Sequence, residues 1–152
     1  MIARPNGKIK MPRTMQTLIK THKMNRTYHG NHFFVLSKGN NAGRPLDKPC
    51  PNCFVIVTKC PKEKHLLYWL CFGLWQCGYF HPYLAGSVIP FLRLPELKSI
   101  ISNARTQIEQ RKTEYEKAVE TLNKLLQLQQ NISQQLQLIS QAKTSLMSKL
   151  LR

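Results

Sequence analysis

The last third of the chain contains neither glycine nor proline from Asn103 onward, and apolar residues recur there in heptads. Two sets alternate: Ile108, Tyr115, Leu122, Leu136 and Leu150 form one, and Ala118, Leu125, Ile132, Ile139 and Leu146 form the other. Gln129 and Lys143 interrupt the first set. Polar residues at the contact positions of a coiled coil fix the register of the helices and the number of helices that associate. The pattern predicts one coiled-coil helix over 103–152, on the order of 70 Å long.

An apolar strip of that length is too large for a small globular part to cover, so the helix needs a partner. We expect a homodimer, or pairing with a coiled coil of another protein, with a helix folded back on its own domain as the alternative. The side chains predicted to be buried on dimerisation are Leu122, Leu125, Ile132, Leu136, Ile139 and Leu146.

The chain is strongly basic, because 23 Lys and Arg stand against 7 Asp and Glu, giving a formal net charge of +16 at pH 7. No acid precedes Asp47, and such a balance attracts polyanions, nucleic acid first and an anionic membrane second. Outside the C-terminal helix only Asp47, Glu63 and Glu96 remain. Metal-dependent nucleases and glycosidases need clustered carboxylates. We therefore expect a binding protein and not an enzyme.

The middle of the chain predicts a small mixed β/α domain, and the chain as a whole an α+β fold. Runs of aromatic and β-branched residues at 32–36 and 54–58 indicate strands. Pro61 suits the first turn of a helix whose apolar body covers 65–80, with an extended run at 88–92 and a short helix at 95–100 to follow. The expected organisation is a basic, flexible arm at 1–30, a recognition-like domain at 31–102 and the coiled-coil helix at 103–152.

Residues 66–92 carry no formal charge, but Gly, Pro, Gln and His interrupt them well short of the roughly 20 apolar residues that a membrane span needs. The basic N-terminus also lacks the apolar core of a secretory signal. We expect a cytoplasmic protein that does not enter the membrane and keeps its five cysteines reduced.

Cys50 and Cys53 form a CxxC pair, and Cys77 and His81 follow with C-x3-H spacing. These four could close a zinc tetrahedron, which would stabilise a domain with a small core. Buried thiols without metal are the preferred alternative, and a redox pair is a third. No cofactor is otherwise expected.

Basic residues in the predicted arm and loops are the candidate contacts to nucleic acid, because loops on a rigid scaffold usually carry the contacts to phosphates and base edges. They are Lys8, Lys10, Arg13, Lys38, Arg44, Lys48, Lys59, Lys62, Lys64 and Arg93. The aromatic residues could stack on bases, although core packing is the preferred interpretation.

The order of elements resembles the target-recognition domain and spacer helix of type I restriction specificity (S) subunits. The resemblance covers roughly residues 50–150 and is carried by the strand at 52–57, the helix start at 65–70, the Gly86-Ser87-Val88-Ile89-Pro90 turn, the 94–98 segment and the opening of the long helix at 107–110. The chain is also similar to small proteins of bacterial mobile elements that share its Gly43-Arg44-Pro45-Leu46 and Pro49-Cys50-Pro51-Asn52-Cys53-Phe54 patterns. The S-subunit resemblance implies DNA binding without catalysis.

These observations predict a non-catalytic nucleic-acid-binding module, with duplex DNA as the first candidate, that dimerises through its C-terminal helix. Two alternatives stay open. One is an adaptor or anti-restriction protein whose coiled coil pairs with helices of another complex. The other is a small zinc-stabilised RNA-binding protein, since charge alone does not separate RNA from DNA.

Overall fold

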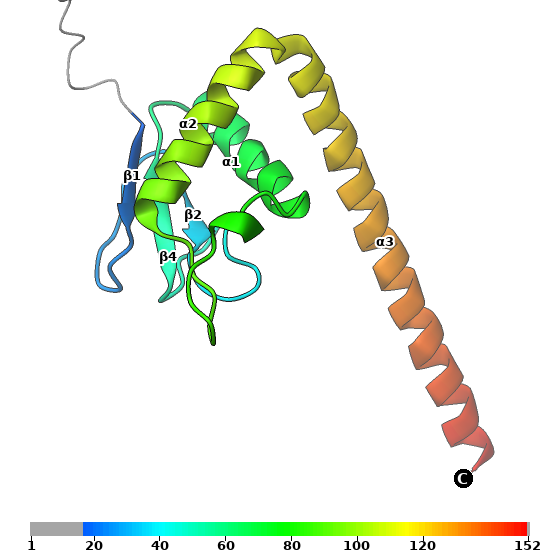
Figure 1. Ribbon diagram of the computed structural model, residues 1–152. Coiled ribbons are helices and arrows are strands. Elements are labelled where there is room, and N and C mark those ends of the chain that lie inside the picture. Colours follow the sequence, from blue (N-terminus) through cyan, green and yellow to red (C-terminus); the bar gives the residue numbers. More distant parts are fainter. Residues whose placement is uncertain (1–16, 152) are drawn as a thin grey trace, which may run out of the picture. The chain divides into compact units, whose positions relative to one another are not determined.

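A computed structural model describes residues 17–151. Its elements, labelled in Figure 1 where there is room, are β1 (Leu18–Thr21), β2 (His32–Leu36), β3 (Pro45–Leu46), β4 (Cys53–Val57), α1 (Pro61–Gln76), the 3-10 helix η2 (His81–Tyr83), α2 (Leu94–Gln110) and α3 (Lys112–Leu150). The expected α+β class with a long C-terminal helix is confirmed. The chain divides into two compact units, the first ending at Thr106 and the second beginning at Gln107.

The strands form one antiparallel sheet in the order β1-β4-β2-β3. On β4, Val57 pairs with Leu18 of β1 and with His32 of β2, so both neighbours run antiparallel to it. β1 and β2 are therefore parallel to each other, and residues 22–31 must return along the whole sheet to connect them. The rings of His22 and Tyr28 in this connection lie 5.2 and 6.1 Å from the ring of Phe34, which places the connection across one face of the sheet.

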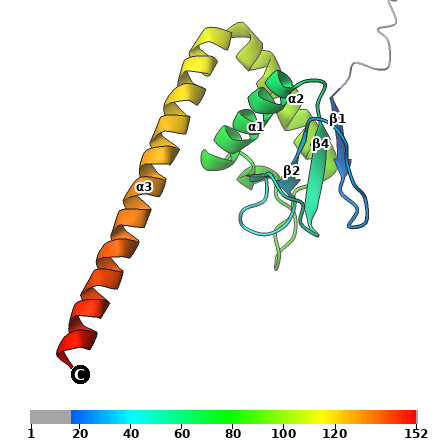
Figure 2. The same ribbon diagram turned by 180° about the vertical axis from the view of Figure 1, so that it is seen from behind.

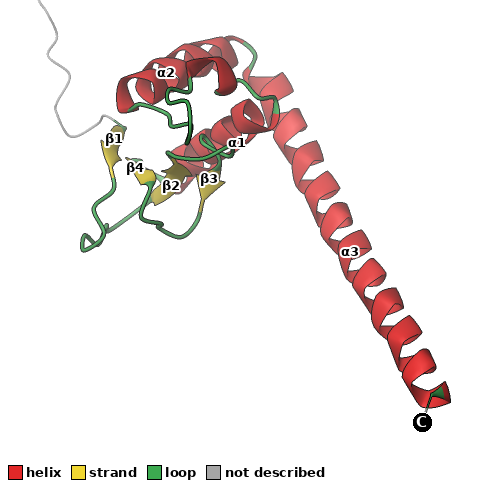
Figure 3. Ribbon diagram, turned by 60° about the horizontal axis from the view of Figure 1, so that its bottom comes forward, coloured by secondary structure: helices red, strands yellow, loops and turns green. Residues whose placement is uncertain are grey.

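The helices of the first unit cover the other face, as Figure 3 shows. Phe33 and Ile56 point to that side, both fully buried, and Phe33 meets the ring of Tyr68 on α1 at 5.5 Å. Leu67 and Leu97 bring α1 and α2 into the same core. Continuous burial of both strand faces explains why β2 and β4 read as unbroken apolar runs.

Helix α1 begins where Pro61 predicts, with proline in its first turn. It ends at Gln76, four residues before the expected boundary. The chain leaves the helix through Gly78, whose φ of +68° lets its N–H reach the carbonyl of Trp75 at 2.9 Å. The predicted start of α1 is confirmed, and glycine sets its end.

The expectation of a flexible arm over residues 1–30 is wrong at residues 18–21, which form β1. Four residues of mixed character carry little strand signal by themselves. Pairing with the buried strand β4 supplies the backbone partners, so tertiary context decides the conformation here. Lys8, Lys10 and Arg13 lie outside the described residues.

The C-terminal helical region is divided at Arg111, not between residues 100 and 103. Arg111 has φ −127° and ψ 37°, which separates α2 from the 39-residue α3. At about 1.5 Å per residue α3 is roughly 58 Å long, shorter than the continuous helix that the heptads predict. Among residues 17–151, no helix is long and apolar enough to cross a membrane.

Candidate nucleic-acid interface

Three segments of the first unit meet at one end of the sheet, where β1 and β2 end and β4 begins. They are the turn at 23–26, the loop at 37–44 and the hairpin at 84–92, and both Figure 1 and Figure 2 show them together at the bottom of the sheet. We call this group of loops the loop end. Its segments are far apart in sequence, so only the fold brings them together.

Backbone hydrogen bonds hold the loop at 37–44 to the hairpin at 84–92. Leu92 N donates to Ser37 O, and Gly39 N donates to Pro90 O, both at 2.8 Å. Leu36 N in turn donates to Arg44 O at 2.9 Å, which returns the loop to the sheet. Two of the three segments of the loop end are therefore hydrogen-bonded to each other, and one of them to β2.

Five basic side chains are exposed at the loop end: Lys23, Arg26, Lys38, Arg44 and Arg93. Aromatic rings position two of the guanidinium groups. That of Arg44 lies 5.2 Å from the ring centre of Trp75, and that of Arg26 lies 5.9 Å from the ring centre of Tyr28. Stacking of this kind holds the guanidinium plane while its N–H groups stay available to a phosphate.

Arg93 pairs with Glu96 at 2.7 Å, and its side chain is still 59 % exposed. The acids near the sheet are mostly committed to such internal pairs. Of the three acids in the described part of the first unit, Glu96 pairs with Arg93 and Glu63 pairs with Arg105, leaving the exposed Asp47. Twelve Lys and Arg occupy the same stretch, residues 17–106. The positive charge of the sheet unit is therefore mostly uncompensated.

The structure brings Lys38, Arg44 and Arg93 together at the loop end but places Lys59, Lys62 and Lys64 elsewhere. Lys59 follows β4, and Lys62 and Lys64 lie at the start of α1, all at the opposite end of the sheet because β4 runs away from the loop end. Lys48 lies in the turn between β3 and β4. The seven predicted contacts that fall within residues 17–151 thus do not form one surface.

Lys23 and Arg26 are basic residues of the loop end that the sequence does not single out. They fall within the stretch assigned to a flexible arm. The Asn-Arg-Thr-Tyr context between two strand-like runs is compatible with a turn, and recognition of β1 would have been needed to place it. In the structure Arg26 N donates to Lys23 O at 3.0 Å and closes this turn.

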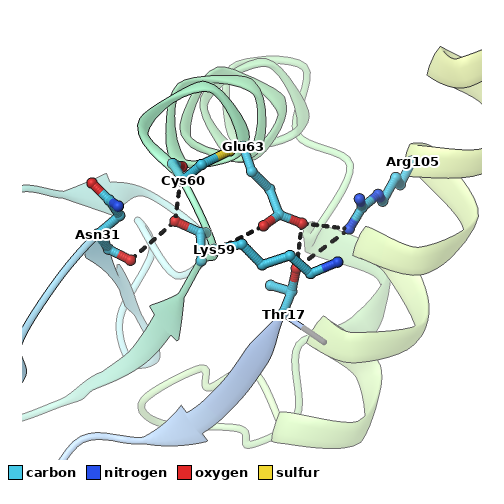
Figure 4. Close-up of polar contacts among 7 residues, drawn as sticks. Thr17, Asn31, Lys59, Cys60, Glu63 and Arg105 are labelled. Atoms are coloured by element: carbon cyan, nitrogen blue, oxygen red, sulfur yellow. Dashed lines mark hydrogen bonds and ion pairs between the residues drawn. The ribbon is translucent and has the colours of Figure 1, made fainter. Parts of the chain in front are cut away.

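At the opposite end of the sheet the Glu63 carboxylate joins α1 to α2 and to Thr17, the residue before β1. Thr17 Oγ1 donates to Glu63 Oε1 at 2.6 Å, Arg105 Nη1 lies 3.0 Å from the same oxygen, and Lys59 N donates to Oε2 at 2.9 Å (Figure 4). Burial alone would raise the pKa of this carboxyl, but these hydrogen bonds and the Arg105 charge together lower it below its usual value. This cluster has every oxygen occupied, and we assign it a structural role.

The predicted zinc ligands do not come together. Cys53 is buried and its Sγ donates to Cys50 O at 3.0 Å, whereas Cys77 is exposed at the end of α1. No three His, Cys, Asp or Glu side chains within residues 17–151 are placed to hold a metal ion. Within the described residues the four-ligand site inferred from spacing is therefore not assembled, although the two pairs have the spacing of zinc ligands in the sequence.

Burial also sets the chemistry of the thiols. It raises the pKa of Cys71 to about 12, and burial together with the neighbouring Cys50 raises the pKa of Cys53 to about 11. Both thiols stay protonated at neutral pH, whereas nucleophilic and redox cysteines act as thiolates. The interpretation of these two as buried structural thiols fits the geometry.

Some of the aromatic side chains belong to the core, as the preferred interpretation of the sequence has it: Phe33, Phe34, Phe54, Trp69 and Phe80 are buried. Phe91 is exposed. Tyr79 and Tyr83 are also exposed and stack on each other at 6.2 Å. They line an open hollow of about 320 Å³ together with residues of the first turns of α2, namely Pro95, Glu96, Ser99, Ile100 and Asn103.

The predicted dimerisation residues lie on α3, and most of them are uncovered. Leu122 is half-buried, while Leu125, Ile132, Leu136, Ile139 and Leu146 are 48–64 % exposed. Every residue from 127 to 151 is exposed in the single chain. The helix thus presents the apolar strip that the heptads predict.

The chain belongs to a family described as a family of unknown function, DUF6943, whose model matches residues 19–149. The match covers both the sheet unit and nearly all of α3. No curated protein and no solved structure matches the chain.

Proposed function

We propose that this protein is a non-catalytic nucleic-acid-binding module of the cytoplasm that grips duplex DNA with its loop end and dimerises through α3. The observation that carries the proposal is the charge of the sheet unit, with twelve Lys and Arg against three acids in residues 17–106. Two of those acids already pair with arginines of the same unit. A field of this sign attracts the phosphate backbone from a distance and supplies most of the affinity of non-specific binding.

The loop end is the best candidate contact surface because it combines exposed cations with a fixed backbone. Arg26 and Arg44 are held by aromatic rings, and Lys38 lies in a loop bonded to the hairpin. Phosphate contacts of this kind set the orientation of a protein on the duplex. The resemblance to S subunits agrees with a DNA-binding role that involves no catalysis.

Dimerisation through α3 would link two loop ends in one assembly. Ile132 and Ile139 occupy one seam position, and Leu122 and Leu136 occupy the other, as in a coiled coil. Each fully buried side chain of this type contributes about 1.5–3 kcal/mol before the cost of ordering it. An uncovered strip of this length would otherwise promote aggregation.

The test is the salt dependence of duplex binding. A fluorescent duplex is titrated with the full-length protein at several salt concentrations, and anisotropy gives the affinity. For phosphate contacts the logarithm of the binding constant falls linearly with the logarithm of salt concentration, by about 0.9 per contact. Replacement of Lys38 or Arg93 with alanine should lower that slope by roughly 1 each. Lys62→Ala, an exposed lysine at the opposite end of the sheet, is the matched control and should leave it unchanged.

Absence of salt-sensitive duplex binding at low ionic strength would refute the proposal. Competition with a structured RNA separates the RNA alternative, which gains if RNA displaces the duplex at equal nucleotide concentration. An equal effect of Lys38→Ala and Lys62→Ala would place the contacts outside the loop end.

A second candidate function, the adaptor, rests on the exposed apolar face of α3 over residues 127–151. It would pair with helices of another complex, and the basic surface would then be incidental. Light scattering separates the two. A full-length chain that is monomeric at micromolar concentration favours the adaptor, and a dimer favours the first candidate.

A further inference from the structure

The hairpin at 84–92 ends in a tip whose side chains are apolar and almost fully exposed. Val88 is 89 % exposed and Ile89 is 62 % exposed, and Phe91 behind them is 37 % exposed. We call Val88 and Ile89 the apolar tip. The hairpin that carries it belongs to the loop end and projects downward from the first unit in Figure 1. Single exposed apolar residues are ordinary, and what distinguishes this pair is its place at the end of a hairpin among basic loops.

The hairpin is built to hold the tip in place. Ala85 N donates to Phe91 O at 2.9 Å and Phe91 N donates to Ala85 O at 2.8 Å, which closes the stem. Gly86 has φ +92°, and a Cβ there would come within 2.7 Å of Ile89 O, so the turn needs glycine at this position. Pro90 then restricts the backbone, and its carbonyl accepts from Gly39 N. The tip is therefore presented in a fixed position.

The surroundings of the tip indicate the chemistry of its partner. Lys38 pairs with Phe91 of the hairpin, Arg93 follows the hairpin directly, and no acid lies between residues 84 and 95 or between residues 37 and 44. When the phosphates of a nucleic acid contact these cations, its bases lie close to the apolar tip. Val88 and Ile89 have no side-chain donor or acceptor, so they cannot read base edges by hydrogen bonding.

We propose that Val88 and Ile89 form a wedge that enters the minor groove of duplex DNA and inserts at a base step, unstacking it and bending the duplex. The proposal rests on the proposed function and adds to it the way in which the loop end engages the duplex. Apolar side chains inserted from the minor groove kink DNA by about 20–90° and bring more phosphates within reach of the protein. Lys38, Arg44 and Arg93 are placed to receive them. A-form RNA, with its wide and shallow minor groove, offers no equivalent entry.

The experiment uses full-length protein and a duplex of about 30 base pairs with a central TA step, since such steps kink easily. The adenine of that step is replaced with 2-aminopurine, whose fluorescence rises when it unstacks. Dyes at the two ends report bending by energy transfer. The test variant is the double substitution Val88→Ser with Ile89→Ser. The control is Leu138→Ser, which alters an equally exposed apolar side chain on α3 outside the two heptad sets.

Wild type and Leu138→Ser should both raise the 2-aminopurine signal and the energy transfer. The double variant should bind with affinity within roughly threefold of wild type and with a salt slope no steeper than that of wild type, because an unbent duplex brings no additional phosphates into contact, but it should lose both signals. Wild type should also prefer a duplex with a mismatch at the central step by roughly tenfold, because a disrupted step costs less to open, and the double variant should lose that preference. Circular dichroism and thermal melting confirm that the variant is folded.

Salt-sensitive binding by wild type without either signal would overturn the wedge and leave the proposed function standing. Signals that persist in the double variant would do the same. If wild type shows no salt-sensitive binding at all, the proposed function fails first. Vesicles of phosphatidylserine and phosphatidylcholine form a second arm. Vesicle binding that depends on Val88 and Ile89, with DNA distortion that does not, would assign the tip to an anionic membrane and overturn the proposal.

Discussion

Glu63 shows how a single acid is used in a basic protein. It occupies the first turn of α1, where a negative charge also suits the positive end of the helix dipole, and it accepts the N–H of Lys59 just before the helix. The same carboxylate pairs with Arg105 of α2, and its side chain is only 9 % exposed. One residue therefore fixes the start of one helix and its contact with another.

Replacing Glu63 with glutamine should lower the free energy of unfolding by about 1–3 kcal/mol at pH 7, because Arg105 and one N–H lose a charged partner. The folded-state pKa of Glu63 lies below its ordinary value of 4.5. Its contribution in wild type is therefore complete above about pH 4.5 and is lost as pH falls through the folded pKa. Urea unfolding at several pH values measures both effects.

Glu120→Gln is the matched control for Glu63→Gln. Glu120 also has a lowered pKa, from its hydrogen bond and ion pair with Lys124 on α3, but the pair is fully exposed. Exposed pairs of this kind contribute little to stability. Equal losses in the two variants would show that the Glu63 cluster does not join the elements as described.

Four of the five cysteines should divide by accessibility when the native protein is alkylated at about pH 8. Cys60 and Cys77 are exposed and should react quickly, whereas Cys53 and Cys71 should react only in denaturant, because burial keeps their thiols protonated. Mass spectrometry of peptides after timed iodoacetamide treatment gives the rates. Protection of Cys77 that a chelator removes would point instead to bound zinc.

At the scale of elements, the sequence predicts what local chemistry determines. β2 is found at the predicted residues, β4 within one residue, and α1 begins at its first-turn proline. The heptads correctly indicate a long helix. In each case the signal lies in the segment itself, as an apolar run or a repeated spacing.

Elements whose conformation depends on residues far away in the sequence cannot be predicted from local patterns. β1 exists because β4 offers a pairing edge, and the break at Arg111 involves neither glycine nor proline. The loop end illustrates the point for the site. Lys38 and Arg93 are 55 positions apart and meet only because the segments at 37–39 and 90–92 pair. Spacing in the sequence cannot show that Lys59, Lys62 and Lys64 lie at the other end of the sheet.

Two glycines offer a test of the elements they belong to. Gly43 has φ +97°, and a Cβ there would lie 2.1 Å from the ring of Phe80, so Gly43→Ala should destabilise the fold by about 2–4 kcal/mol. Gly73 lies inside α1 with nothing within 4 Å of the same position. Gly73→Ala should therefore stabilise by about 0.5–1 kcal/mol. Thermal melting of both variants checks the pair, and destabilisation by Gly73→Ala would mean that α1 is packed more closely than described.

At the scale of the whole molecule, different features of the two units can be predicted from the sequence. The charge of the sheet unit is a property of composition and could be stated without a structure. The surface on which that charge acts could not, since it depends on how three loops converge. For α3 the opposite holds, because the heptad spacing itself specifies which side chains share a face.

The proposed dimer makes the last prediction. Ile132→Lys combined with Ile139→Lys places two charges in the seam of α3, where burial without a partner is costly. The full-length variant should be monomeric by light scattering at micromolar concentration while wild type is a dimer. Leu138→Lys, on the same helix but outside the heptad sets, is the control and should remain a dimer. Because two linked loop ends gain avidity, the monomeric variant should bind a duplex at least about tenfold more weakly despite its two added positive charges. Tighter binding by that variant would show that charge alone governs affinity and that the second loop end contributes nothing.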